Sequence, residues 1–234
     1  MPAPCTSSPA STAAPRRLTS DMVLVHRVFR REFGMLPTLI DGVGPGDTTR
    51  AAVVAGHVRE LMTALRQHHN AERDLLWRRL RDRDALDEPV QRRLGDWHRE
   101  HLALLSELDG LLPLWEGVAA QDLRDVLVDI AGELSEEVAA HLDASERLVL
   151  PAVDQHFTSG EWLALGLRVT GSIPLHRMAW MLGAMLEDAT EAERKQLMAK
   201  VPGPARLIYR MVGRDQYARE MSAVRGSLVD PVQL

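Results

Sequence analysis

The sequence predicts an all-α protein, and three observations support this fold class. Apolar residues recur at intervals of three and four along most of the chain, which is the period of an amphipathic helix. Strand signals are nearly absent, since β-branched residues rarely cluster and there are only 2 Tyr and 3 Phe. Four long segments of helical period follow one another between short breaks. We therefore expect an antiparallel up-down-up-down four-helix bundle with a C-terminal helical extension.

The boundaries of these helices carry recognisable signals. The first helix begins at the N-cap pair Ser20 and Asp21 and ends before the Gly-rich break DGVGPGD. The third helix has Pro89 in its first turn, where the missing N–H of proline interrupts no intrahelical hydrogen bond. The four predicted helices span about residues 20–40, 48–83, 87–115 and 119–156.

The chain divides into three predicted segments. Residues 1–19 are rich in Ala, Ser, Thr and Pro, and we expect a disordered tail there. Residues 20–157 form the predicted bundle. A candidate N-cap at Thr158 and Ser159 starts a series of shorter helical segments separated by Gly and Pro, so residues 158–234 are predicted to be an extension packed on the bundle.

Composition and charge exclude several classes of protein. A net charge of −5 with both signs interspersed provides no basic face for nucleic acid. The one cysteine, Cys5, cannot form an internal disulfide, which fits a reducing compartment. No apolar run approaches the roughly 18–20 residues of a membrane span, and the N-terminal stretch lacks the apolar core of a secretory signal. We expect a cytoplasmic protein that contacts neither nucleic acid nor membrane.

The placement of the histidines indicates a site. Every long predicted helix carries at least one, and two of these histidines have a carboxylate four or five residues downstream, Glu72 and Glu146. The five histidines are His26 on the first helix, His68 on the second, His98 and His101 on the third, and His141 on the fourth. In an up-down-up-down bundle they lie at similar distances from the shared loops, to about one helical turn for the first three helices.

These histidines also share apolar stripes, so they are expected to face the interior. His68 lies on one stripe with Leu61 and Leu65, and His101 lies on another with Leu104 and Leu108. Several imidazoles and two carboxylates in an apolar interior would be unfavourable without a bound group. A pair of metal ions removes this penalty, and a mixed imidazole–carboxylate set suits iron, manganese or zinc.

Four segments carry a resemblance to a known family. They are HRVFRREF from His26, HHNAERDLLW from His68, WHREHLALLSEL around His101 and HLDASERLVLP from His141. In order, spacing and accompanying apolar signatures, the chain between about residues 20 and 157 resembles hemerythrin-like, or HHE cation-binding, domains.

The resemblance implies a centre of two non-haem iron ions, joined by an oxo or hydroxo bridge, with terminal histidine ligands. It further implies that Glu72 and Glu146 are bridging carboxylates. Hemerythrins proper have two histidines four residues apart on the third helix, whereas here Trp97 stands four residues before His101 and the second histidine is His98. We expect His98 to be a fifth histidine ligand; the alternative is a residue beside the ligands or on the helix surface. Glu146 follows His141 by five residues, so it reaches the centre from the flank or through a bulge in the helix.

The resemblance leaves the activity open. Family members bind dioxygen reversibly, sense it, or handle peroxide or nitric oxide, so a carrier, a sensor and an enzyme all remain possible. The small-molecule partner is expected to be dioxygen, peroxide or nitric oxide. A ferritin-like site would use Glu-x-x-His motifs, and none of the nine histidines has a glutamate three positions before it.

Overall fold

A computed structural model describes residues 18–171 and 173–226 of the chain, and these ranges contain helices and no strand. The all-α prediction is therefore confirmed. Most of the predicted N-terminal tail, residues 1–17, lies outside the described residues. Among the described helices, none is long and apolar enough to cross a membrane.

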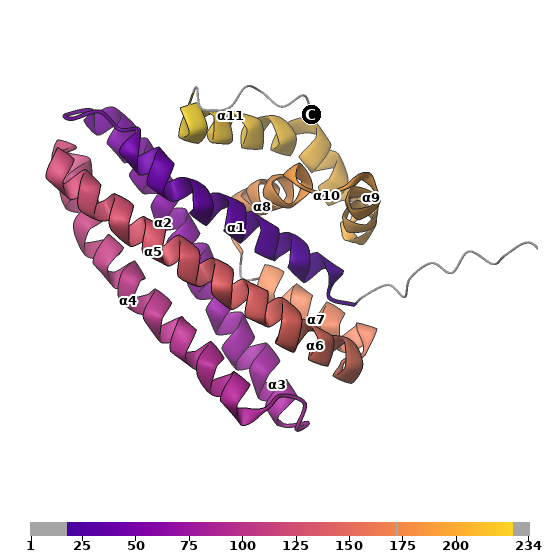
Figure 1. Ribbon diagram of the computed structural model, residues 1–234. Helices are drawn as coiled ribbons and strands as arrows, with labels where there is room; N and C mark the ends of the chain where they lie inside the picture. Colours follow the sequence, from indigo (N-terminus) through magenta and orange to yellow (C-terminus); the bar gives the residue numbers. More distant parts are fainter. Residues whose placement is uncertain (1–17, 172, 227–234) are drawn as a thin grey trace, which may run out of the picture.

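The four long helices occur where the sequence predicts them (Figure 1). They are α1 (Ser20–Asp41), α2 (Thr48–Ala71), α4 (Glu88–Val118) and α5 (Gln121–Ala144). A π-helical turn, η1 (Glu72–Trp77), extends α2 into the short α3 (Arg78–Arg81). A second, η2 (Ser145–Val149), extends α5 into α6 (Leu150–His156). Two of the predicted continuous helices thus contain a π turn.

Local chemistry sets the ends of these helices. The Asp47 carboxylate accepts a hydrogen bond from the backbone N–H of Arg50 and caps α2. Ala119 adopts a left-handed conformation with φ of 46° and ends α4, and its carbonyl accepts a hydrogen bond from Gly46 N–H. That last bond joins the α1–α2 connection to the α4–α5 connection, so the two loops lie at the same end of the bundle.

The four long helices pack around a shared interior. Helix α1 contacts α2 and α5, and α4 contacts the same two helices, so the contacts form a closed ring. Arg59 pairs with Glu116, and Arg30 pairs with Asp143 at 2.6 Å. Fully buried side chains fill the interior; they include Phe33, Leu36, Ile40, Leu61, Leu65, Leu105, Leu108, Leu112, Trp115, Leu134 and Val138.

Two separate apolar clusters lie along the length of the bundle. The larger reaches from the α1–α2 loop to Leu65, Leu104 and Leu142. The smaller begins beyond them, at Leu76 and Val149. Between Leu65 and Leu76 the chain carries His68 and Glu72, and between Leu142 and Val149 it carries Glu146. A polar layer of predicted site residues therefore separates the two apolar clusters.

The helices after residue 158 contact the bundle at several places. Helix α7 (Ser159–Thr170) contributes Trp162 and Leu165 to the smaller apolar cluster. Helix α8 (Leu175–Glu187) contacts α1, and α11 (Arg214–Arg225) contacts α8 and α2. The remaining elements are α9 (Glu191–Lys200), α10 (Gly203–Ile208) and η3 (Tyr209–Gly213).

The packing of α8 on α11 requires a glycine. A Cβ on Gly183 would lie 2.5 Å from the ring of Tyr217, so only glycine allows these helices to approach so closely. The Thr158 hydroxyl and the Glu161 carboxylate form a reciprocal capping box at the start of α7, which confirms the predicted N-cap at Thr158.

Candidate metal centre

The polar layer gathers residues from all four long helices. His26 comes from α1, His68 from α2, and His141 from α5; Glu72 is the first residue of η1. Helix α4 adds His98 and His101, and η2 adds Glu146. All of these side chains except Glu146 are buried, and Glu146 is 28% exposed.

Each carboxylate of the layer lies in a π turn. Glu72 opens η1, four residues after His68, and Glu146 is the second residue of η2, five residues after His141. A π turn inserts an extra residue into an α-helix and rotates the side chains that follow it. Because Glu146 follows His141 by five residues, we expected it to reach the centre either from the flank or through a bulge in the helix. The structure contains such a bulge.

Glu72 occupies the middle of the layer. One of its oxygens, Oε2, lies 3.1 Å from His98 Nε2 and 3.5 Å from His141 Nε2. The other, Oε1, lies 3.5 Å from His68 Nε2. The two oxygens of one carboxylate therefore face imidazoles on different sides, which is the arrangement that a bridging ligand needs.

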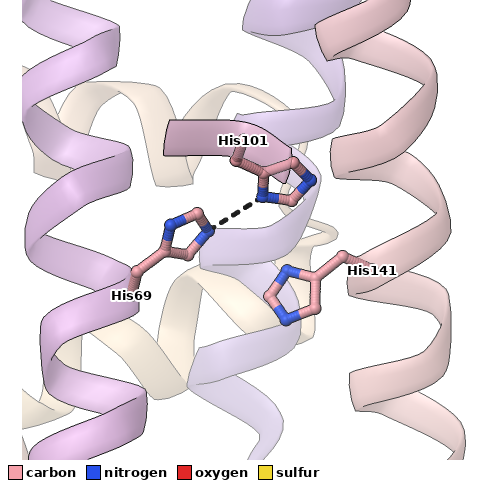
Figure 2. Close-up of side chains that lie close together, drawn as sticks. All are labelled: His69, His101 and His141. Carbon is pink, nitrogen blue, oxygen red and sulfur yellow. Dashed lines mark hydrogen bonds between the residues drawn. The ribbon is translucent and has the colours of Figure 1, made fainter. Parts of the chain in front are cut away.

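Within the described residues, the buried side chains form three groups in which a ligand atom from each member lies within 4.8 Å of the others. The first consists of His26, His68 and Glu72, and the second of Glu72, His98 and His141. They share Glu72. The third consists of His69, His101 and His141, and it shares His141 with the second (Figure 2). The groups thus form one continuous cluster.

Glu146 lies beside this cluster and belongs to none of the three groups. Its Oε1 is 3.0 Å from His26 Nδ1 and accepts a hydrogen bond from Arg30 at 2.7 Å. Its side chain lines a surface cavity of about 340 Å³ together with Thr19, Val23, Asp143, Arg147 and Leu150. The cavity therefore leads from the surface to the carboxylate that contacts His26.

His69 enters the cluster although it is the residue after His68, the predicted ligand, and so lies off the predicted ligand face. Its ring is 3% exposed and stacks on His98, with centroids 3.9 Å apart. Its Nε2 lies 3.2 Å from His101 Nδ1. The neighbouring His68 lies on the apolar stripe of an ideal helical wheel. The helical period alone therefore favoured His68 over His69 as the predicted ligand. The adjacent His-His pair was the only sequence signal for His69.

Two tryptophans close the layer. The ring of Trp77 stacks on His98 at 4.4 Å, and the ring of Trp97 lies 5.9 Å from that of His141. Trp97 Nε1 donates a hydrogen bond to Glu137 at 3.0 Å, so this carboxylate has a partner outside the cluster. Both aromatic rings exclude water from the imidazoles.

Burial keeps the imidazoles neutral, and the imidazoles around the central carboxylate keep it ionised. It lowers the pKa of His68 and of His141 to about 4, against the opposing charge of Glu72. Burial and the neighbouring His141 lower the pKa of His101 to about 3. Burial would raise the pKa of Glu72, but the imidazoles around it, His68 foremost, hold that pKa well below its usual range. Neutral imidazoles and an ionised carboxylate are the protonation states that bind a cation.

The nitrogen atoms of these rings test whether a metal fits. Hydrogen-bond partners within the described residues are lacking for the buried Nε2 atoms of His26, His68 and His101 and for both ring nitrogens of His141. Buried polar atoms without partners are rare, because each costs about 1–3 kcal/mol. A metal ion would use these lone pairs, and imidazole with carboxylate is a common donor set for iron and zinc. The residues fit a metal centre.

This fold and cluster define a helical-bundle protein with a buried His/Glu cluster suited to metal cations. The family model of the hemerythrin HHE cation-binding domain matches residues 17–153. The chain belongs to the hemerythrin HHE cation-binding family, which confirms the resemblance seen in the sequence. Searches of curated proteins and of solved structures gave no match.

Proposed function

We propose that the chain is a non-haem di-iron protein that binds dioxygen, or a related small ligand such as peroxide or nitric oxide, inside the bundle. The main support is the position of Glu72, whose two oxygens face His68 on one side and His98 and His141 on the other. A single carboxylate between two imidazole groups suits two metal ions better than one.

The proposal includes the antiparallel up-down-up-down order of α1, α2, α4 and α5. Contacts between consecutive helices support it. His57 pairs with Glu32 and His26 lies beside His68, so residue numbers rise on α1 as they fall on α2. Thr19 N–H donates to Asp154 near one end of α1, and Arg124 lies beside Asp41 near the other, so α1 and the α5–α6 segment run in opposite directions.

The proposed ligand set combines the residues predicted from the sequence with the groups of buried side chains described above. One iron would be held by His26, His68 and Glu72, and the other by Glu72 and His141 with His98 and His101 of α4. Glu146 would complete the centre as the second bridge. It already contacts His26, and turning its carboxylate away from Arg30 would bring it toward the metals.

Bound iron would supply an open coordination position and the redox chemistry for a small ligand. The chain's own residues control access to that position. The cavity beside Glu146 reaches the carboxylate that contacts His26, while Trp77 covers His98 on another side. Arg30 holds the Glu146 carboxylate in place there. A small ligand is favoured because the histidines of the layer are buried.

Anaerobic reduction of the iron-loaded protein followed by exposure to air, monitored by visible absorption, tests the proposal. We expect a spectral change on exposure to dioxygen that reverses when dioxygen is removed. With peroxide, evolution of oxygen or consumption of an added substrate would assign an enzyme instead of a carrier or sensor. An iron-loaded protein whose spectrum responds to none of dioxygen, peroxide and nitric oxide would contradict the proposal.

A further inference from the structure

His69 lies in the metal layer but stands outside the ligand set of the proposed function. It comes from α2, one residue after His68, and its ring points between α4 and α5 toward His101 and His141 (Figure 2). A fully buried imidazole that contacts mainly other imidazoles needs a physical reason for its position.

The distance between His69 and His101 fits a shared metal ion. His69 Nε2 lies 3.2 Å from His101 Nδ1. Two nitrogens bound to one zinc-like ion at about 2.0–2.1 Å in tetrahedral geometry would be separated by about 3.3 Å. The same separation fits a hydrogen bond, so the distance alone does not decide between them. A third nitrogen nearby favours the metal, because His141 offers a ring nitrogen within 4.8 Å of the other two.

His101 depends on His69 for this role. In the described ranges, His101 joins a candidate metal group only together with His69 and His141. Helix α4 provides no second histidine to that group: Trp97 occupies the position one turn before His101, and His98 is grouped with Glu72. His69 of α2 therefore supplies the imidazole that completes the group with His101 and His141.

His98 has a different surrounding. Its Nε2 lies 3.1 Å from Glu72 Oε2, and its ring is stacked by His69 and by Trp77. These contacts fix the ring against the carboxylate between the two groups. The two stacked histidines thus serve neighbouring positions: His98 faces Glu72, and His69 faces His101 and His141.

We propose that His69 is a metal ligand, which completes a set of three imidazoles with His101 and His141 for one of the two metal ions. The inference rests on the proposed di-metal centre and adds a ligand to it. Three imidazoles beside the shared Glu72 make a softer ligand set than His26 and His68 with Glu72. The two metal positions are therefore unequal, and the His69 position favours zinc-like or later transition metals more strongly.

Zinc titration of the metal-free full-length chain tests this inference. Wild type should bind two equivalents. His69→Gln should bind one equivalent of zinc with wild-type affinity. It should bind the other equivalent more than about 100-fold more weakly. This loss of affinity is larger than the 10–100-fold typical of residues that only support a ligand. His57→Gln is the matched control, since His57 is another buried α2 histidine but contacts Glu32. It should bind both equivalents normally.

Two-bond ¹H–¹⁵N spectra of the zinc-loaded wild type test whether His69 binds zinc without the need for a substitution. Nε2 of His69 should show the signature of a zinc-bound nitrogen. A free acceptor nitrogen at His69 with two zinc ions bound, or unchanged zinc affinity of His69→Gln, would overturn the inference and leave the proposed function standing. A wild-type chain that binds fewer than two ions, whether zinc or iron, would instead overturn the di-metal centre itself.

Discussion

Helix α1 borders two buried polar clusters, and a comparison between them shows what a ligand site requires. One is the histidine layer, to which α1 contributes His26. The other lies under the C-terminal helices, where Glu32 of α1 meets His57 of α2 and Arg225 of α11. Glu32 and His26 are both fully buried. Of these two clusters, only the histidine layer has the donor set of a candidate metal site.

The Glu32 cluster is neutralised by the protein itself. Glu32 pairs with Arg31 at 2.8 Å, with Arg225 at 3.1 Å and with His57 at 3.2 Å. Arg225 also pairs with Glu187 at 2.5 Å. Burial would raise the pKa of Glu32, but the hydrogen bond with His57 and the charge of Arg31 lower it to about 2. Each carboxylate here faces a guanidinium.

The histidine layer is built in the opposite way. Around Glu72 there are imidazoles in place of guanidinium groups, and burial keeps those imidazoles neutral. Both clusters contain buried atoms without a hydrogen-bond partner, but those of the Glu32 cluster, such as Glu32 Oε2 and His57 Nε2, belong to ion-paired side chains. Buried polar residues thus indicate a cation site when neutral imidazoles surround a carboxylate, and indicate a structural network when opposite charges are already matched.

The largest expected difference between the clusters concerns metal binding. His68→Ala and His141→Ala should each strongly lower the iron content, because each removes a ligand beside Glu72. They should also lose most of the metal-dependent stability, about 4 kcal/mol when free metal is 1,000 times its Kd. Elemental analysis and denaturant unfolding measure both effects. Wild-type iron content in either variant would remove that histidine from the centre.

Acid should destabilise the metal-free chain through the histidine layer. The pKa of His68 is about 4 in the fold and near 6.5 when unfolded, so the unfolded chain binds more protons between these values. Its contribution to stability is complete above pH 6.5 and is lost as the pH falls to about 4, by about 3 kcal/mol for this one group. Unfolding by urea at pH 7 and at pH 4.5 measures the loss. A flat pH profile over this window would contradict neutral buried histidines.

The Glu32 cluster should affect stability without affecting metal. Glu32→Ala leaves Arg225 and Arg31 with one carboxylate fewer, and breaking a buried ion pair in this way typically costs about 3 kcal/mol. The free energy of unfolding should fall accordingly, while the metal content of the folded protein stays at the wild-type value. Loss of metal in folded Glu32→Ala would show that the two clusters are coupled through α1.

A smaller effect is expected at the edge of the histidine layer. Glu146→Gln removes the charge that faces His26 and Arg30, and it should weaken the binding of at least one metal by at least about 10-fold. Glu137→Gln is the matched control, since Glu137 accepts a hydrogen bond from Trp97. Two metals bound with unchanged affinity in Glu146→Gln would point to another carboxylate as the second bridge.

The sequence was sufficient to predict the histidine layer but not the Glu32 cluster. The helical period and the loop positions place His26, His68 and Glu72 at one depth. Both features can be read from local sequence spacing. Glu32 and Arg225 are 193 residues apart, so their pairing depends on how α11 docks. Long-range side-chain pairing of this kind leaves no periodic signal.

Within the layer, the prediction was limited by the assumption of ideal helices. The π turn at Ser145–Val149 carries Glu146, and no composition signal marks such a turn. His69 was separated from the ligand face by one residue, or about 100° on an ideal wheel. The structure nevertheless places it against His101 and His141, in the space between three helices.

Metal analysis of the intact protein, expressed with ample iron and purified without chelator, tests the central claim most directly. Two groups that share Glu72 predict about two iron ions per folded chain. His68→Ala should contain fewer, and Glu32→Ala should match wild type. A folded wild-type chain that contains no iron under these conditions would contradict the claim that the histidine layer is a di-iron centre.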